Sequence, residues 1–157
     1  MSDFELSRST AIDAPAPVVH ALINDFHEWV AWSPWEGIDP DLQRTYTGPE
    51  QGVGATYAWA GNRKAGRGTM RITGSTDREI GIRLDFVKPF KASNEVTFVL
   101  DPDVAGTATA VTWRMTGRRS AVMSAMNKVL NFDKLIGGDF EKGLRQLKQR
   151  AESGPST

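Results

Sequence analysis

Asp133 is the residue whose position in the sequence most favours a chemical role. It lies seven residues after Met126 and eleven before Leu144, within apolar residues at helical spacing, so a helix places its carboxylate on the apolar face. A carboxylate there is costly unless it is solvated or hydrogen-bonded. Gly137, one turn later, removes a side chain from the same line. We therefore predict that Asp133 lines a wet cavity, and the alternative is a structural cap on a polar residue of the sheet.

Aromatic residues supply the second set of candidates. Tyr57 and Trp59 lie in one expected strand, where a phenol could orient a ligand carbonyl or act as a general acid. Trp29, Trp32 and Trp35 cluster ahead of the strands, and large rigid rings bury much area at little entropic cost. We expect Trp32 to line a pocket and Trp29 to belong to the core. The alternative is that all three plug the end of the sheet.

The other reactive residue types form no catalytic set. His20 and His27 have no third ligand spaced to complete a metal site, and no nucleophile elbow is present. The absence of cysteine removes disulfides, thiolate catalysis and cysteine-ligated zinc. The basic segment 62–68 lacks the phosphate-binding pattern GxxxxGK[ST] and reads as a charged hairpin loop. We predict no metal and no cofactor.

Charge and composition narrow the classes of partner. Lys plus Arg equals Asp plus Glu, 19 against 19, so no net field favours nucleic acid or an anionic membrane. The first residues lack the basic and apolar regions of a signal peptide, and no apolar run approaches the ~20 residues that span a bilayer. We expect a cytoplasmic protein, a monomer or homodimer, that neither binds nucleic acid nor inserts into membranes.

The elements that must position these residues follow from periodicity. Alternation predicts a strand over 4–12, and Pro15 marks the first turn of a helix whose apolar residues reach Phe26. A second short helix covers 26–31 and stops at Pro34. Alternating runs with one polar face then predict an antiparallel sheet. The further strands are expected at 41–47, 54–60, 66–76, 79–88, 91–100 and 108–117.

The C-terminal part of the chain predicts a long helix. From Ser120 to about Glu152 there is no proline, and Phe140, Leu144 and Leu147 continue an apolar stripe. Such a helix would be roughly 45 Å long, enough to cross the whole sheet. We see no linker or repeat, so we expect one domain over 1–152 followed by a flexible tail, 153–157.

This order of elements is the pattern of the helix-grip fold, and five motifs resemble one superfamily. The motifs are Ile12-Asp13-Ala14-Pro15, Trp29-x-x-Trp32-Ser33-Pro34-Trp35, Leu84-x-Phe86-x-Lys88-Pro89-Phe90, Thr112-Trp113-x-Met115-x-Gly117 and Asp139-Phe140-Glu141-x-Gly143-Leu144-x-x-Leu147-Lys148. Together they resemble the SRPBCC superfamily, in its polyketide cyclase/dehydrase and lipid transport branch. The resemblance implies an α+β, Bet v 1-like fold in which about seven strands curve around the long helix, with two short helices after the first strand.

The resemblance covers the whole chain and leaves the activity open. We expect an internal cavity for a small hydrophobic or amphipathic ligand, such as a lipid, isoprenoid or polyketide-like molecule, in a carrier or sensor. An enzyme of the cyclase/dehydratase kind and a chaperone-partner module are the alternatives. The residues predicted to line the cavity are Trp32, Tyr57, Trp59, Phe86, Phe98, Trp113, Asp133, Ile136 and Gly137.

Overall fold

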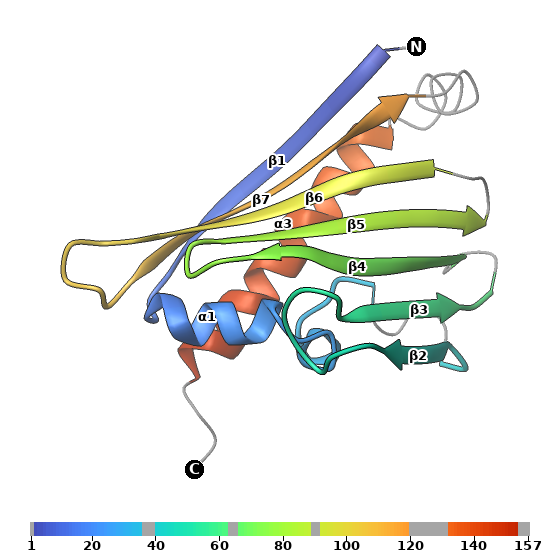
Figure 1. The fold of residues 1–157 in the computed structure, drawn as a ribbon. Helices are drawn as coiled ribbons and strands as arrows, with labels where there is room; N and C mark the ends of the chain where they lie inside the picture. Colours follow the sequence, from blue (N-terminus) through green and yellow to red (C-terminus); the bar gives the residue numbers. More distant parts are fainter. Residues whose placement is uncertain (1, 36–39, 63–65, 89–91, 120–131, 154–157) are drawn as a thin grey trace.

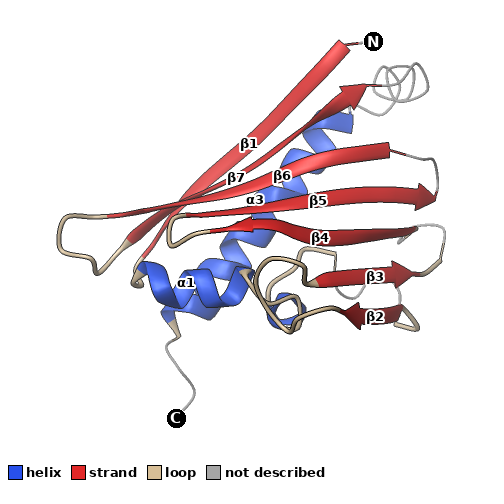
Figure 2. Ribbon diagram, viewed as in Figure 1, coloured by secondary structure: helices blue, strands red, loops and turns tan. Residues whose placement is uncertain are grey.

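The computed structural model describes residues 2–35, 40–62, 66–88, 92–119 and 132–153. Seven strands form one sheet in the order β1-β7-β6-β5-β4-β3-β2, and each neighbouring pair is antiparallel (Figure 1). The strands are β1 (Ser2–Ile12), β2 (Gln43–Thr47), β3 (Thr56–Ala60), β4 (Arg67–Ser75), β5 (Glu79–Lys88), β6 (Ala92–Pro102) and β7 (Thr109–Arg119). The helices are α1 (Ala16–Ile23), the 3-10 helix η1 (Glu28–Ala31) and α3 (Phe132–Glu152) (Figure 2).

This architecture confirms the predicted α+β helix-grip fold. In Figure 1, α3 runs obliquely behind the sheet, across its concave face. The apolar stripe of α3 is buried as predicted, with Phe140, Leu144 and Leu147 exposed by 1%, 2% and 0%. Lys148 stays on the outer side, where its ammonium donates to the carbonyl of Ala11 at 2.9 Å. The predicted first turns of the long helix, 120–131, lie outside the described residues.

The two short helices differ in detail from the prediction. Pro15 is the N-cap of α1 instead of a residue of its first turn, and its carbonyl accepts from the N–H of Val18 at 3.0 Å. The second helix is a single 3-10 turn, and two tryptophans tie it to α1. The indole N–H groups of Trp29 and Trp32 donate to the carbonyls of Ile23 and Leu22, at 2.8 and 2.9 Å. These bonds satisfy carbonyls at the end of α1 and fix where η1 packs.

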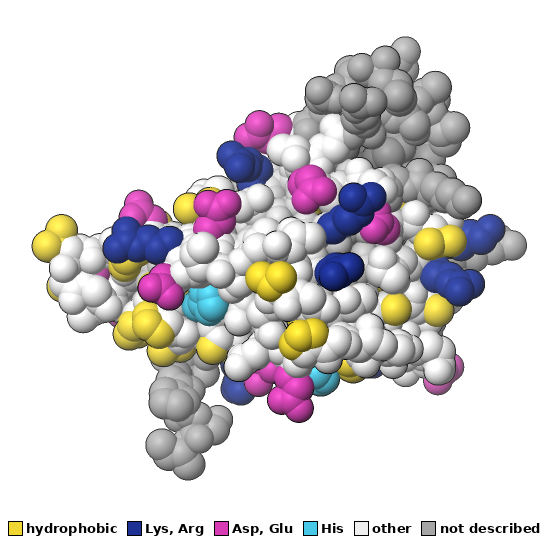
Figure 3. Space-filling model, viewed as in Figure 1, with side chains coloured by type: hydrophobic (Ala, Val, Ile, Leu, Met, Phe, Trp, Pro, Cys, Tyr) yellow, Lys and Arg dark blue, Asp and Glu magenta, His cyan; other side chains and the backbone are white. Residues whose placement is uncertain are grey.

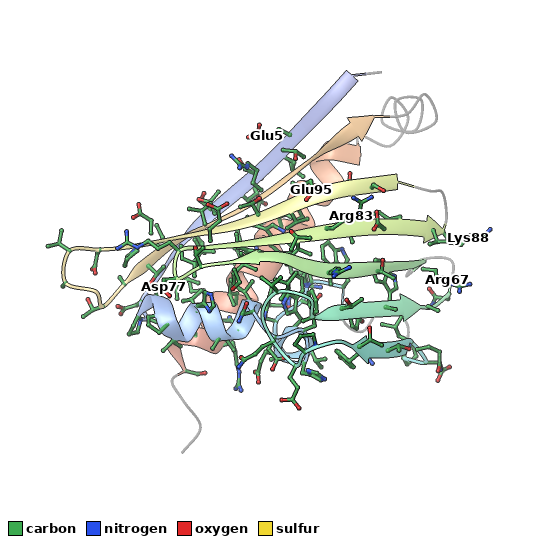
Figure 4. The ribbon with its side chains drawn as sticks, in the orientation of Figure 1. Glu5, Arg67, Asp77, Arg83, Lys88 and Glu95 are labelled. Atoms are coloured by element: carbon green, nitrogen blue, oxygen red, sulfur yellow. The ribbon has the colours of Figure 1, made fainter. Side chains whose placement is uncertain are left out.

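The convex face of the sheet, turned toward the viewer in Figure 3, carries charged side chains of both signs. Figure 4 labels Arg83 of β5 and Glu95 of β6, which are Cα partners on this face. Arg83 also bonds Asp85, with Nε at 3.0 Å from Oδ2. The inward parity is mostly apolar, so the sheet has one wet and one largely buried face. A site for an apolar ligand must therefore lie on the concave side.

Glu152 ties the end of α3 to the chain ahead of α1. Its carboxylate accepts hydrogen bonds from the Lys148 ammonium and from the N–H of Asp13, the latter at 2.8 Å. The bond from Lys148, and then that from Asp13, lowers the pKa of Glu152. The stabilisation is therefore complete above the ordinary glutamate pKa and is lost as the pH falls through the lowered value.

We accordingly expect Glu152→Gln to melt at a slightly lower temperature than the wild type at neutral pH, and at the same temperature in acid. Thermal melts followed by circular dichroism across this pH range measure the difference. Glu5→Gln, at an exposed position of β1, is the matched control and should melt like the wild type at every pH. A Glu152→Gln deficit that persists in acid would show that the carboxylate charge is not the cause.

Candidate functional site

The register of the sheet arranges the inward side chains in transverse rows. The Asn94 row consists of Tyr46, Tyr57, Met70, Leu84, Asn94 and Gly117, each the Cα partner of the next, from β2 to β7. The adjoining Trp59 row contains Trp59, Gly68 and Phe86, from β3 to β5. Both rows lie toward the ends of the strands that adjoin segments 63–65 and 89–91, which are outside the described residues.

On the other side of the Asn94 row, the concave face is closed. Most side chains of the next rows are 9% exposed or less, and these lie with α1, η1 and α3 in one core cluster. These side chains are Leu6, Ile72, Ile80, Ile82, Val96, Phe98, Leu100, Val111, Trp113 and Met115. This part of the sheet is a packed core.

Three predicted cavity residues belong to this packed core. Trp113 is 1% exposed and stacks on Phe140 of α3, with ring centroids 4.2 Å apart and planes inclined by 9°. Phe98 lies 4.9 Å from Trp113, and Trp32 lies 5.8 Å from it, both fully buried. Trp32, Phe98 and Trp113 thus lie in the buried core cluster, and their contact with a ligand stays a prediction; Trp29 is core as predicted.

The other three aromatic candidates form a continuous half-buried surface, which we call the aromatic surface: Tyr57, Trp59 and Phe86. Tyr57 and Trp59 have nearly parallel rings, 6.2 Å apart with planes inclined by 18°, and Phe86 meets Trp59 edge-on at 5.8 Å. Gly68 makes this possible, since a Cβ there would lie 2.6 Å from Cη2 of Trp59. The glycine leaves room for the edge of the indole beside β4.

Three predicted cavity residues, Asp133, Ile136 and Gly137, lie on α3. The backbone of Asp133 and Ile136 lies in α3, but their side chains are outside the described residues, so their roles stay predictions. Gly137 is buried, and a Cβ there would lie 2.3 Å from Nη2 of Arg8. Arg8 also donates from Nε to Glu141 at 3.2 Å. The guanidinium of Arg8 thus lies directly beside Gly137, and a contact between Gly137 and a ligand stays a prediction.

A cleft of about 180 Å³ opens beside Tyr46, at the edge of the sheet. His27 stacks on Tyr46, with ring centroids 4.0 Å apart, and its Nδ1 lies 2.7 Å from Oδ1 of Asp25. The sequence analysis assigned His27 to no catalytic set and missed this pair, although Asp25 stands only two residues before it. The lining residues are Phe26, His27, Tyr46, Thr47, Gly48, Pro49, Glu50, Ala55 and Thr56.

Comparison with protein families adds the decisive observation. The family described as "Polyketide cyclase / dehydrase and lipid transport" matches residues 3–152. The chain belongs to this family. The match spans β1 through the end of α3, so it includes the aromatic surface, the cleft and the packed core. A search of curated proteins gave no match.

Solved structures show the same fold as this polyketide cyclase/dehydrase family member. A protein of Nitrosospira multiformis is 19% identical, with a TM-score of 0.62 over 94% of this chain and 96% of that one. The Aha1 dimer of Colwellia psychrerythraea is 15% identical, with a TM-score of 0.68 over 98% and 99%. DynU16, from the dynemicin biosynthetic locus, is 14% identical, with a TM-score of 0.62 over 96% and 48%.

Two features of the described residues of this family member concern metal ions and membranes. Within those residues, no three His, Asp or Glu side chains lie close enough together to hold a metal ion. None of the described helices is long and apolar enough to cross a bilayer. The chemical groups that the described site offers are aromatic faces, phenols, one imidazole–carboxylate pair and the amide of Asn94.

Proposed function

We propose that this family member binds a small hydrophobic or amphipathic molecule, of lipid, isoprenoid or polyketide-like character, against the aromatic surface. The observation that carries the proposal is the contrast along one concave face. Its inner rows are closed by α3, whereas Tyr57, Trp59 and Phe86 are only half-buried. Large rings held rigidly at such a place favour the face of a flat, apolar ligand. We propose a carrier or sensor role in the cytoplasm, as a monomer or homodimer.

The binding energy should come mainly from apolar burial. At about 25 cal/mol per Å², covering roughly 300 Å² of ligand surface contributes on the order of 7 kcal/mol before ordering costs. A hydrogen bond to a phenol or amide adds about 1 kcal/mol and sets the orientation. The chain has equal numbers of acidic and basic residues, 19 each, so long-range steering of an ion contributes little.

We expect Trp59→Ala to weaken binding of the neutral fluorescent probe N-phenyl-1-naphthylamine about tenfold. Losing about 60 Å² of ring contact costs about 1.5 kcal/mol. Titration followed by probe fluorescence and tryptophan quenching measures the dissociation constant. Val104→Ala is the control, because Val104 is fully exposed in the turn between β6 and β7, and it should leave the affinity unchanged.

The same titration at low and high salt tests the apolar origin of binding. The affinity should hold within a few-fold, because dispersion and hydrophobic burial are not screened as charges are. A steep loss of binding with added salt would mean that a cation such as Arg44 or Arg67 carries the interaction. The proposed class of ligand would then be wrong.

The second candidate function, a cyclase/dehydratase activity, is favoured by the Asp25–His27 pair. A carboxylate 2.7 Å from Nδ1 orients an imidazole so that Nε2 can take or give a proton. Native mass spectrometry and organic extraction would recover the co-purifying ligand. Incubated with fresh protein, a substrate would become an isomer or a species one water lighter, and His27→Ala would abolish the conversion. Recovery of the ligand unchanged would support the carrier role instead of the enzyme.

A further inference from the structure

Asn94 is the polar member of an otherwise apolar stretch of the concave face. It lies on β6 with the same inward parity as Val96 and Phe98, and it is 4% exposed. Its Cα partners are Leu84 on β5 and Gly117 on β7. Because Gly117 contributes no side chain, β7 places none directly beside Asn94 in this row.

The side-chain oxygen of Asn94 has no hydrogen-bond partner in the part of the chain that the structure describes. Buried polar atoms in native proteins are nearly always paired, since an unpaired one loses its bonds to water without replacement. The other buried polar residue of the core, Thr109, follows the rule and donates to the carbonyl of Ala14 at 2.8 Å. Asn94 therefore needs an explanation.

A second unpaired atom, Nε1 of Trp113, gives a useful contrast. Its ring is enclosed by Phe98, Phe140 and Trp32 and packs against Gly143, where a Cβ would lie 2.8 Å from the ring. That indole is a core element. Asn94 instead lies two residues outside the closed rows, where the half-buried rings begin.

The position of Asn94 relative to the aromatic surface suits an anchor for a ligand. Phe86 is the diagonal neighbour of Asn94 across β5 and β6. The Cα atoms of such diagonal neighbours usually lie about 7–8 Å apart. Tyr57 lies in the same row three strands away, about 14 Å at the usual strand spacing. A molecule of two or three fused rings could cover Phe86 while one end reaches the amide.

We propose that Oδ1 of Asn94 accepts a hydrogen bond from the ligand and selects molecules with a neutral donor, a hydroxyl or amide N–H, at the end of an apolar body. The inference rests on the proposed function and narrows its class of ligand. A neutral donor is favoured over an ammonium because Leu84 and Met70, the next side chains of the row, offer no countercharge. Asn94 is thus a specificity-determining residue, separate from the apolar contacts that hold the ligand.

The test uses two probes that differ only in the donor, 2-naphthol and 2-methoxynaphthalene. Their dissociation constants are measured for the wild type and for Asn94→Leu, which keeps the volume and removes the acceptor. We expect the preference for 2-naphthol to fall about fivefold in the variant, the net effect of one hydrogen bond, with 2-methoxynaphthalene bound as well as before. The empty variant should also melt at a higher temperature than the wild type, since an unpaired polar group is gone.

Three results would overturn the inference, and they can be told apart. If both probes bind the wild type but the preference is the same in Asn94→Leu, the amide selects nothing and the proposed function stands. If the variant loses both probes equally while still folded, Asn94 is a structural residue. If neither probe binds the wild type, the proposed function fails as well. Asn94→Val, with a side chain suited to a strand, replaces the leucine variant if that one does not fold.

Discussion

Trp113→Ala should lower the free energy of unfolding by about 3–5 kcal/mol, the usual cost of truncating a fully buried large aromatic residue. Trp113 is 1% exposed and sits where α3 meets the sheet. Its ring stacks on Phe140 and contacts Phe98 and Trp32, so its removal leaves a cavity that several rigid rings border. Such rings collapse poorly into a void, which places the cost at the upper end of the range.

The half-buried ring of Trp59 should respond differently. The ring of Trp59 borders water on one side. Trp59→Ala should therefore lower the free energy of unfolding by at most about 2 kcal/mol, and it should also weaken probe binding. Urea unfolding followed by far-ultraviolet circular dichroism gives both values, and an unchanged slope with urea verifies that the same transition is compared. Equal costs for the two variants would place Trp59 in the closed core and remove the surface on which the proposed function rests.

Alanine substitutions at two glycines of α3 should change the free energy of unfolding in opposite directions. We expect Gly143→Ala to destabilise the protein by about 1–3 kcal/mol through overpacking. A Cβ at Gly143 would lie 2.8 Å from Cζ3 of Trp113 and 2.9 Å from Cδ of Pro34, two ring atoms that cannot swing aside. The gain in helix propensity, about 0.5–1 kcal/mol, is too small to offset this contact.

Gly138→Ala is the matched control in the same helix. Nothing lies within 4 Å of a Cβ at Gly138, so the variant should gain the helix propensity and become about 0.5–1 kcal/mol more stable. The same urea titrations compare both variants with the wild type. If Gly143→Ala also stabilised the protein, α3 would have to lie further from Trp113 than the structure places it.

The sequence by itself determined the order of the elements and the face of the sheet to which most side chains point. Alternation along β5, β6 and β7 predicted the inward side chains, because successive residues of a strand point to opposite faces. The stripe of Phe140, Leu144 and Leu147 predicted the buried side of α3 in the same way. These patterns are local, so a single sequence suffices to recognise them.

Only the tertiary structure decided which inward residues are covered. Trp113 and Phe86 both point inward, but α3 packs on the row of Trp113 and leaves Phe86 half-buried. The alternation of residues along a strand does not show how far along that strand a helix packed on its inward face extends. The same reason hid Arg8, whose guanidinium fills the space beside Gly137 from a strand more than a hundred residues away in the sequence. Such contacts depend on where two distant elements meet, which spacing within either element cannot encode.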